Sequence, residues 1–525
     1  RARTRSDGWS RFLSCSISPG ITYSIPKTSD NLSLRFEASY TSEKEELWRD
    51  YDINYGNNPE AAERRRQYTD NSPNHRLDLS GNLRYSAMLP VGYFQIEYSY
   101  SFADVVKDSY MYALDRLENM GIYGVVPEGY LAVLDPANSY TSREIDNTHN
   151  ITPRMMIRKD LSDKEMVNVN ISPSLSLKHR HFDYTRNHRD YLLSKTNLSV
   201  DVYSIWDAMV ELYFNGKETD GRRRYRNMIR YSYRLNTNLP GMADMIDVTD
   251  DSDPLNIYTG NPDLKSELVH RHLMRWSYTP HSHPTLNNIL YGSFSHTSNA
   301  LTRGFNYDTS TGVRRNMMYN VGGNRTVAFT NELSWQFGTK KQFTLWSETD
   351  LNIARTSDMI GVNVDTPMLS KVNNRSLSEK FRLGWQFRDQ SLQLRCDFTN
   401  RHTTSSREGF NNLDANHVNY GISGVFKLPA GFGISTDFMC YTRCGYGMSE
   451  LDTTDPIWNM RVSYCPPILK SRLVFMLDGF DLLHKLSNVN YAVTASGRTV
   501  SYTNALPRYV MLSVQYRLNI QPKKK

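Results

Sequence analysis

The sequence has no long hydrophobic run. Only 39% of its 525 residues are hydrophobic, and no stretch of roughly 18 apolar residues exists that could form a membrane-spanning helix. A soluble chain of this length would be expected to form about three or four domains, each with apolar runs for its own core. Such runs are missing too, because nearly every apolar residue stands at an alternate position. These absences exclude transmembrane helices and disfavour a set of soluble domains.

Cysteine is also scarce, with five residues at wide spacing: Cys15, Cys396, Cys440, Cys444 and Cys465. An odd, scattered set does not indicate a disulfide framework, although Cys440 and Cys444 could approach each other near a strand end. The sequence contains no nucleophile elbow, no metalloprotease helix motif and no phosphate-binding loop. We therefore predict a protein that is not an enzyme and that uses no cofactor.

Charge gives a third exclusion. The net charge is +7, and the basic residues are spread along the chain, whereas a nucleic-acid groove requires a clustered basic stripe. We therefore predict no nucleic-acid partner. The chain opens at Arg1 without a Met or an apolar export signal, and we expect it to be the later part of a longer precursor.

What the sequence does have is strict alternation, and the segment 381–398 shows it best. Its odd positions before the central turn and its even positions after it are apolar or aromatic, while the residues between them are Arg, Gly, Gln or Asp. Period-two alternation is typical of a strand with two unlike faces. We predict a hairpin with its turn at 388–391, its apolar side chains in lipid and its polar side chains toward a lumen.

The same pattern recurs in about nineteen strands, each predicted to span roughly 9–15 residues. Two of them, at 191–204 and 209–216, are expected to join through Trp206 and Asp207. The longest connections are predicted at 42–75, 103–148 (with a short helix) and 217–266. Short turns at one end and long loops at the other are typical of all-β transmembrane antiparallel β-barrels of the outer membrane. A soluble all-β binding protein is the weaker alternative.

Strand direction bears on completeness. The final strand must run toward the periplasm because a long loop precedes it, and counting back gives the first strand the same direction. Barrels of this kind normally begin with the opposite direction and have an even strand number, and an open edge in lipid leaves backbone groups unsatisfied. We therefore expect residues 1–525 to form one barrel domain that lacks its first strands. A 22-stranded barrel is predicted, and 20 or 26 strands also satisfy the arithmetic.

Two segments resemble the motifs of a known family. The run 260–267 is similar to the G-N-P-x-L-K-P-E signature of TonB-dependent outer-membrane receptors, with Ser266 in place of the second Pro. The segment 477–487 and the closing strand resemble the end of Bacteroidetes outer-membrane barrels, and 307–313 resembles their Y-D-x-x-T-G pattern and is predicted to form its own hairpin. The signature residues, expected to be structural, are Gly260, Asn261, Pro262, Asp263, Leu264, Lys265, Asp478, Gly479, Phe480, Asp481, Pro507, Arg508 and Tyr509.

The resemblance implies a receptor for active uptake of a solute such as a siderophore, glycan, peptide or vitamin. It also implies an N-terminal plug and a TonB box, which we expect upstream of this chain together with the signal peptide. The implied partners are outer-membrane lipid and lipopolysaccharide, the plug, the TonB complex and a surface lipoprotein. The residues alone leave open a structural, export or passive-channel barrel, which the absence of a plug and TonB box immediately upstream would favour.

Aromatic residues in the first two long loops are candidate ligand contacts, because rigid amphipathic rings often bind ligands. These candidates are Trp48, Tyr51, Tyr110, Tyr112 and Tyr123. The alternative is that they pack the loops or join the aromatic girdle of the membrane. Arg223 and Arg224, in the third long loop, could contact lipopolysaccharide or an acidic ligand, or could continue a solvated strand.

Two patterns bear on metal binding. The sequence His-Arg-His at 179–181 and 270–272 puts two imidazoles on one face of a strand, but the spacing fixes no third ligand. The acidic run 244–253 could bind calcium, although it lacks the Gly and the closing Glu of an EF-hand. We interpret these segments as polar rim residues and a solvated loop, and we predict no metal site.

Overall fold

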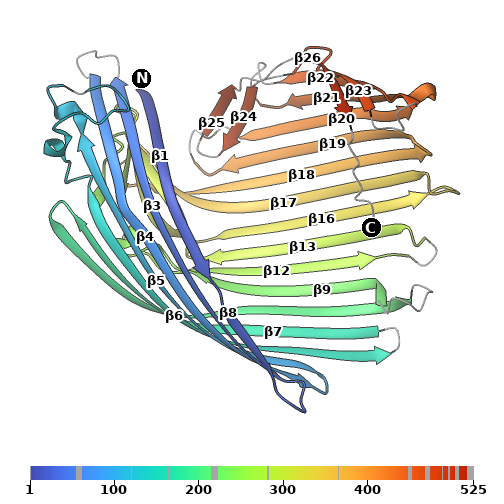
Figure 1. Cartoon of the computed structure of the whole chain (residues 1–525), viewed down its shortest axis with the longest axis horizontal. Coiled ribbons are helices and arrows are strands. Elements are labelled where there is room, and N and C mark those ends of the chain that lie inside the picture. The colour runs from blue at the N-terminus through green and yellow to red at the C-terminus, as the bar shows by residue number, and fades with distance from the viewer. Residues whose placement is uncertain are drawn as a thin grey trace, which may run out of the picture.

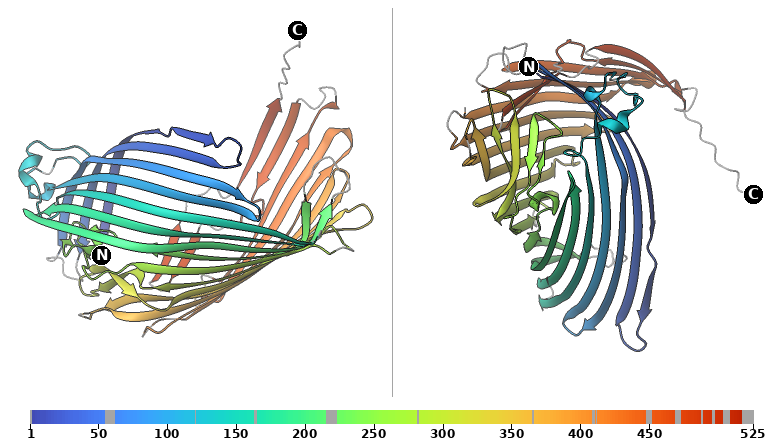
Figure 2. Two further views of the ribbon diagram at one scale, coloured as in Figure 1. Left: turned by 90° about the horizontal axis from the view of Figure 1, so that it is seen from below. Right: turned by 90° about the vertical axis from the view of Figure 1, so that its left-hand side faces the viewer.

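The structure is a computed structural model that describes residues 2–54, 62–119, 121–162, 165–214, 223–280, 283–364, 366–407, 410, 412–446, 452–467, 473–486, 489–494, 497–502 and 508–516. One curved antiparallel sheet of 24 strands dominates it, beside a separate two-stranded hairpin (Figures 1 and 2). Within these ranges, no helix is long and apolar enough to cross a membrane.

Strands that are neighbours in the sequence pair with one another along most of the sheet. In chain order the elements of the sheet are β1 (Ala2–Ile17), β2 (Gly20–Ser24), β3 (Asn31–Asn54), β4 (Ala62–Leu89), β5 (Gly92–Ala113), β6 (Tyr140–Ser162), β7 (Glu165–Arg186), β8 (Arg189–Phe214), β9 (Arg223–Asn238), β10 (Thr249–Asp250), β11 (Asn256–Thr259), β12 (Glu267–Tyr278), β13 (Leu286–Ser298), β14 (Ala300–Tyr307), β15 (Arg314–Val321), β16 (Asn324–Phe337), β17 (Phe343–Val362), β18 (Met368–Phe387), β19 (Gln390–Ser405), β20 (Leu413–Lys427), β21 (Phe432–Cys444), β22 (Thr453–Tyr464), β23 (Leu473–Phe480) and β26 (Tyr509–Tyr516).

The wall of this sheet has nineteen strands in the part of the chain that the structure describes. β1 and β2 pair with successive parts of β3 and act as one strand, while β10, β11, β14 and β15 belong to loops. The remaining pair, β24 (Val489–Thr494) and β25 (Gly497–Tyr502), forms the separate hairpin. The predicted all-β class and strand number are confirmed.

The two faces of the wall are chemically unlike, as the β18–β19 hairpin shows. Directly opposite residues of an antiparallel pair share a face, and Leu383 lies opposite Leu394. On that face Phe381 and Leu394 are 39% and 44% exposed. On the other face Arg382 pairs with Asp397 at 2.5 Å. The predicted separation of apolar from polar side chains is confirmed; we call the apolar side the outer face and the polar side the inner face.

Strand length differs from the prediction in the first half of the chain. β3 to β8 each have between 22 and 28 residues, so much of the predicted loops 42–75 and 103–148 is strand. Between β5 and β6 only 114–139 remains, with the short helices η2 (Leu114–Arg116) and η3 (Tyr130–Val133), where a short helix was expected. The extensions carry polar residues on both faces, so apolar alternation did not reveal them.

Two further predictions of strand position were wrong. β8 runs straight through the expected turn, with Trp206 47% exposed on the outer face and Asp207 3% exposed on the inner face. There Asp207 pairs with Arg230 of β9 at 2.6 Å. β9 itself lies inside the predicted loop 217–266. The strand number was nevertheless right, because one strand predicted as two offset one strand missed.

The connections of the wall separate by length, as expected. The turn between β18 and β19 is two residues, Arg388 and Asp389, rather than the four predicted, and the left-handed φ of 52° at Arg388 makes the tight reversal. At the opposite end, the predicted hairpin around 307–313 is confirmed as β14–β15. There β11 pairs in parallel with β15, and β14 pairs in parallel with β17.

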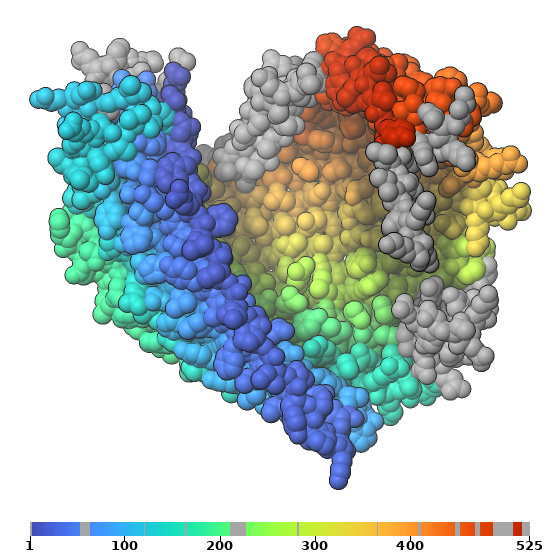
Figure 3. Space-filling view, viewed as in Figure 1, coloured from blue at the N-terminus to red at the C-terminus, as the bar shows by residue number. Residues whose placement is uncertain are grey.

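β1 and β26 form the two edges of the sheet, and no pairing joins them among the strands described above. The sheet curves so that its inner face is hollow, with the first strands on one side and the last strands on the other (Figure 3). Polar side chains such as Arg382, Asp397 and Asp207 point into this hollow, so the wall has a polar inner face and a mainly apolar outer face, as outer-membrane barrels do.

Candidate ligand cavity

A cavity of about 380 Å³ lies on the inner face at the long-loop end of the sheet. β5, β6 and β7 form one wall, and the loop 239–266 with the β14–β15 hairpin forms the other. Glu144 has the parity opposite to the exposed Ile151 and Met155 of β6, so its side chain points inward. The lining includes Lys107, Glu144, Tyr184, Asp244, Tyr258 and Arg303. This volume falls in the range of roughly 300–1,000 Å³ that is usual for small-molecule sites.

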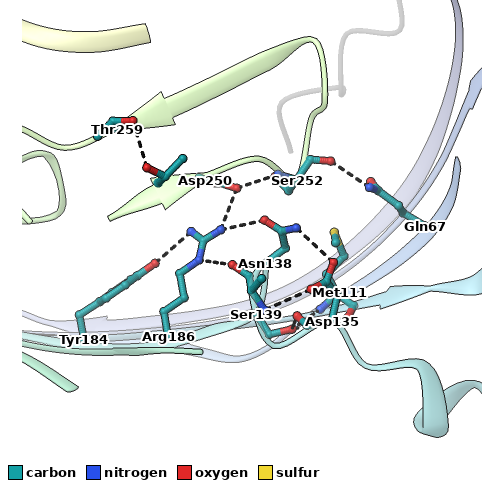
Figure 4. A network of polar contacts seen from close by, with 12 residues as sticks. Gln67, Met111, Asp135, Asn138, Ser139, Tyr184, Arg186, Asp250, Ser252 and Thr259 are labelled. Carbon is teal, nitrogen blue, oxygen red and sulfur yellow. Dashed lines mark hydrogen bonds and ion pairs between the residues drawn. The ribbon is translucent and has the colours of Figure 1, made fainter. Parts of the chain in front are cut away.

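Arg186, at the end of β7, joins three parts of the chain beside the cavity (Figure 4). Its side chain is 5% exposed, and its guanidinium donates to Asn138 Oδ1 at 2.8 Å and pairs with Asp250 Oδ1 at 3.2 Å. Asp250 Oδ1 also accepts from the Ser252 amide at 3.0 Å, and Gln67 of β4 donates to the Ser252 carbonyl at 2.9 Å. The network ties the loop 239–266 to β4 and β7, so protein contacts fix the shape of the cavity.

Apolar packing holds the same loop against the inner face. Met242 and Ile246 are 1% and 6% exposed and pack on Phe182 of β7, which is 4% exposed. Arg180, two positions before Phe182, donates to the Pro240 carbonyl at 2.7 Å. Burying a side chain of this size contributes about 1.5–3 kcal/mol, so the loop is an ordered part of the fold rather than a solvated excursion.

The first half of the Gly-Asn-Pro signature completes the far wall. A Cβ added to Gly260 would lie 1.8 Å from the carbonyl oxygen of Ile246, so the backbones approach too closely for any residue but glycine. Asn261 donates from Nδ2 to the Met318 carbonyl of β15 at 2.9 Å. Its Oδ1 accepts from the Asp263 amide at 3.1 Å. The signature therefore joins the loop to the β14–β15 hairpin.

The second half of the signature leads into β12. The Lys265 amide donates to Asn320 Oδ1 at 2.7 Å, and Leu264 is 6% exposed. Pro262 lies in the connecting turn, before β12 begins at Glu267. This is the predicted position, where a long loop feeds a strand.

The cavity carries charge of both signs next to aromatic rings. Burial raises the pKa of Glu144, and the neighbouring Asp146 raises it further. Burial also raises the pKa of Asp244, while Arg303 opposes that rise. The Arg303 guanidinium carbon lies 5.1 Å from the ring centre of Tyr258. Such a site can hold a solute that has both charged and flat or apolar groups.

The candidate aromatic residues do not gather in this cavity. Trp48 lies opposite Tyr68, which lies opposite Tyr112, so the three share the outer face. Their ring centres are 4.7 Å apart for Trp48 and Tyr68 and 5.9 Å apart for Tyr68 and Tyr112. With Leu114 they form a buried cluster, and Tyr110 and Tyr123 pack against it. These rings cover the upper strand extensions.

Tyr51 has the opposite parity on β3 and lies on the inner face. It is 3% exposed, and burial raises its pKa, with Asp253 of the loop 239–266 adding to the rise. Of the five aromatic candidates, Tyr51 is thus the one whose side chain faces the loop that encloses the cavity.

Arg223 and Arg224 lie at the short-turn end of the sheet, away from the long loops and the cavity. They begin β9 and pair with Phe214 and Tyr213, on the side where β6 and β7 join by a short turn. Of the two roles considered for these residues, the structure shows the second, in which they continue a strand. A loop was expected from 217 to 266, and β9 occupies its first part.

The C-terminal signature has structural contacts. Asp478 of β23 pairs with Arg461 at 2.5 Å, and Gly479 and Phe480 complete the strand. Asp481, which is 0% exposed, accepts from the Lys485 and Leu486 amides at 3.0 and 2.9 Å. Arg508 precedes β26 and Tyr509 begins it, whereas Pro507 lies outside the described residues.

The segments considered for metal binding have other contacts. His270 and His272 meet the hydroxyls of Tyr233 and Tyr231 at 2.9 and 2.8 Å. His179 meets Thr196 at 2.9 Å. Over the described ranges, no three His, Cys, Asp or Glu side chains are grouped as metal ligands would be.

The residues that line the cavity were not recognised as a set from the sequence. Lys107, Glu144, Arg186 and Arg303 come from four separate segments, and no spacing connects them. One signal was available: period-two placement of inward charge continues beyond the apolar part of β5 and β6. Reading that continuation as strand would have placed Lys107 and Glu144 side by side on the inner face.

Comparison with known proteins agrees with this architecture. Residues 222–391 match the profile of the outer membrane protein beta-barrel family. The fold of this chain is that of an outer-membrane β-barrel. No curated protein matches the sequence.

Solved structures align along most of the chain at low identity. The copper transporter OprC aligns with 97% of this chain and 80% of its own at 9% identity, with a TM-score of 0.36. The outer membrane transporter YddB from Escherichia coli aligns with 96% and 75% at 8% identity and a TM-score of 0.34. The ferric citrate transporter FecA aligns with 96% and 78% at 11% identity and a TM-score of 0.34.

Proposed function

We propose that the chain is the barrel of a TonB-dependent outer-membrane receptor that captures a small solute in the cavity beneath the loop 239–266. The observation that carries this proposal is the position of the cavity. It lies on the polar inner face at the long-loop end, and the receptor-like signature at 260–265 builds one of its walls. A passive channel or an export barrel has no need of a packed, charge-lined recess at that place.

The lining favours a solute with charge of both signs. Each wall of the cavity carries one base and one acid, Lys107 and Glu144 on one wall and Arg303 and Asp244 on the other, and charge-assisted hydrogen bonds from both walls would orient a zwitterion. Among siderophores, glycans, peptides and vitamins, a short peptide fits this pattern better than a neutral glycan. The TonB complex, an upstream plug and a surface lipoprotein are proposed partners on the basis of the sequence resemblance.

Uptake and binding of labelled dipeptides and tripeptides test the proposal. The full protein should bind them, and the double variant Glu144→Gln/Arg303→Gln should bind at least about tenfold more weakly, because a hydrogen bond to a charged group contributes about 1.5–3 kcal/mol. Arg382→Gln, on the inner face near the short-turn end of β18, is the matched control. It should bind the peptides as the wild type does.

Cellular uptake separates the receptor from its alternative. Transport by a receptor should stop when the TonB complex is deleted, whereas a passive channel would continue to admit the peptide at its concentration gradient. If the double variant binds peptides as the wild type does, the cavity is not the binding site, even if uptake depends on TonB.

A further inference from the structure

Three arginines from neighbouring strands form a basic patch on the outer face, at the long-loop end of the apolar surface. Arg325 of β16 lies directly opposite Arg355 of β17. Arg375 of β18 lies opposite Ile353, two residues from Arg355. Since opposite residues and residues two apart share a face, all three guanidinium groups project from the same surface as the exposed Ile353. Arg325 and Arg375 are exposed, and Arg355 is half-buried.

Histidines extend this patch on both sides. His296 of β13 lies opposite Arg325, and His270 of β12 lies opposite His296. On the other side, His402 of β19 lies opposite Arg375. Opposite side chains have Cβ atoms about 4.5–5.5 Å apart, so basic groups follow one another across six adjacent wall strands.

The three arginines have no carboxylate partner among the residues that the structure describes, and Nε of Arg355 is buried without a hydrogen-bond acceptor. Other cations on the same face of the sheet are neutralised. Arg143 pairs with Asp104 at 2.7 Å, and Lys44 pairs with Glu46 at 3.2 Å. Like charges directly opposite each other destabilise a sheet, so the contact of Arg325 with Arg355 is a cost that a bound anion would relieve.

The acidic residues on this face lie apart from the three arginines. Glu379 is four positions along β18 from Arg375, about 13 Å at the usual rise of a strand, and Thr349 donates to it. Asp414 lies 3.9 Å from His402 and accepts from Asn400 at 2.8 Å. Neither carboxylate compensates Arg325 or Arg355.

The surface next to the patch is apolar. Two positions toward the short-turn end, the strands present Val327, Ile353 and Leu377 on the same face, and Val327 and Ile353 are 45% and 47% exposed. A ligand of this surface must therefore join an anionic head to an apolar chain. Guanidinium groups bind phosphate oxygens in a bidentate manner, and the patch lies where the lipid-facing surface ends.

We propose that Arg325, Arg355 and Arg375 bind the phosphate head group of a lipid in the outer leaflet of the outer membrane, the phosphorylated lipid anchor of lipopolysaccharide. The acyl chains then lie along the apolar surface of β16, β17 and β18. This site is on the opposite face of the wall from the solute cavity, so it fixes the barrel in its membrane independently of transport.

Binding of lipid A to the delipidated, detergent-purified protein tests the proposal. The triple variant R325Q/R355Q/R375Q should bind diphosphorylated lipid A at least about tenfold more weakly than the wild type, since it loses three charge-assisted contacts to phosphate at once. The matched control K44Q/R143Q removes the two neutralised cations from the same face and should bind as the wild type does. If the triple variant does not fold, the single exposed variants R325Q and R375Q replace it, each with a smaller loss.

Two competitors identify the ligand. Inorganic phosphate in large excess should not displace lipid A, and fully dephosphorylated lipid A should bind much more weakly than the diphosphorylated form. Displacement by inorganic phosphate would reduce the patch to a simple anion site and overturn the lipid assignment. Equal binding of the dephosphorylated lipid, or unchanged binding by the arginine variants, would overturn the proposal entirely.

Discussion

The long-loop ends of β3–β7, called the upper ends here, differ from the wall strands β16–β21 in their surroundings. The upper ends lie in water, whereas the outer face of β16–β21 lies in lipid. In β16–β21 the outer face remains exposed, as at Phe329, Ile353 and Leu394, which are 40%, 47% and 44% exposed. In the upper ends of β3–β5 the outer face is covered, and Trp48 and Tyr68 are 5% and 4% exposed beneath the loop 114–139. Lipid can cover apolar side chains only within the membrane, so beyond it the protein must supply its own cover.

This difference explains where the cavity lies. The long strands reach past the apolar belt, and there both faces of the sheet behave as in a soluble protein. The outer face packs under the loop 114–139, and the inner face packs under the loop 239–266, where Phe182 and Met242 are buried. A preformed recess requires such packed walls, and the short wall strands β20–β22 do not extend far enough to make them.

The largest difference between the two regions is expected when an outer-face aromatic residue is truncated in each. Trp48→Ala should cost about 3–5 kcal/mol of local stability, because it empties a buried site. Phe329→Ala should cost far less, since its ring contacts lipid rather than protein. Hydrogen exchange in the loop 114–139 is the measurement, and it should accelerate for Trp48→Ala alone. Equal acceleration by both variants would contradict the difference between the regions.

A charge placed on each face of β19 tests which face of the wall strands β16–β21 contacts lipid. Leu394→Arg should reduce insertion by about 2–4 kcal/mol if the residue lies near the bilayer midplane, whereas Gln393→Arg adds charge to the polar inner face and should be tolerated. Heat-modifiable migration of protein folded into lipid vesicles measures the folded fraction. Equal loss for the two variants would reverse or remove the assignment of faces.

The sequence was sufficient to predict the sheet wherever lipid imposes the pattern. Alternation at 381–398 specified both faces of β18 and β19, because one face must be apolar. The same reasoning failed at the upper ends of β3–β6, where polar residues occur on both faces and burial comes from loops. It also failed at Trp206 and Asp207, a pair that could end a strand but in fact alternates across β8.

The cavity lay beyond prediction for a related reason. Arg186 pairs with Asp250 only because the loop 239–266 folds back over β7. No sequence pattern in either segment predicts that contact. The Gly-Asn-Pro signature pointed to the correct end of the sheet, since Gly260 permits a backbone approach that other residues prevent. It could not specify the residues on the opposite wall.

The smallest effect on stability is expected from removing an ion pair on the inner face of β18 and β19. Arg382 and Asp397 have side chains that are 23% and 25% exposed, and pairs that remain in contact with water contribute up to about 1 kcal/mol. Arg382→Gln should therefore shift the urea midpoint of refolding only slightly, with less effect at high salt. A loss of several kcal/mol would mean that the lumen is much drier than the structure indicates.

The orientation of the barrel, which places the cavity toward the outside of the cell, has one direct test. Single cysteines are introduced at Ser310, in the β14–β15 turn, and at Asp389, in the β18–β19 turn, after the five native cysteines are changed to serine. Both positions are exposed, so a membrane-impermeant maleimide applied to intact cells distinguishes them by side alone. Labelling at position 310 and protection at position 389 is the predicted result; labelling at 389 with protection at 310 would contradict it.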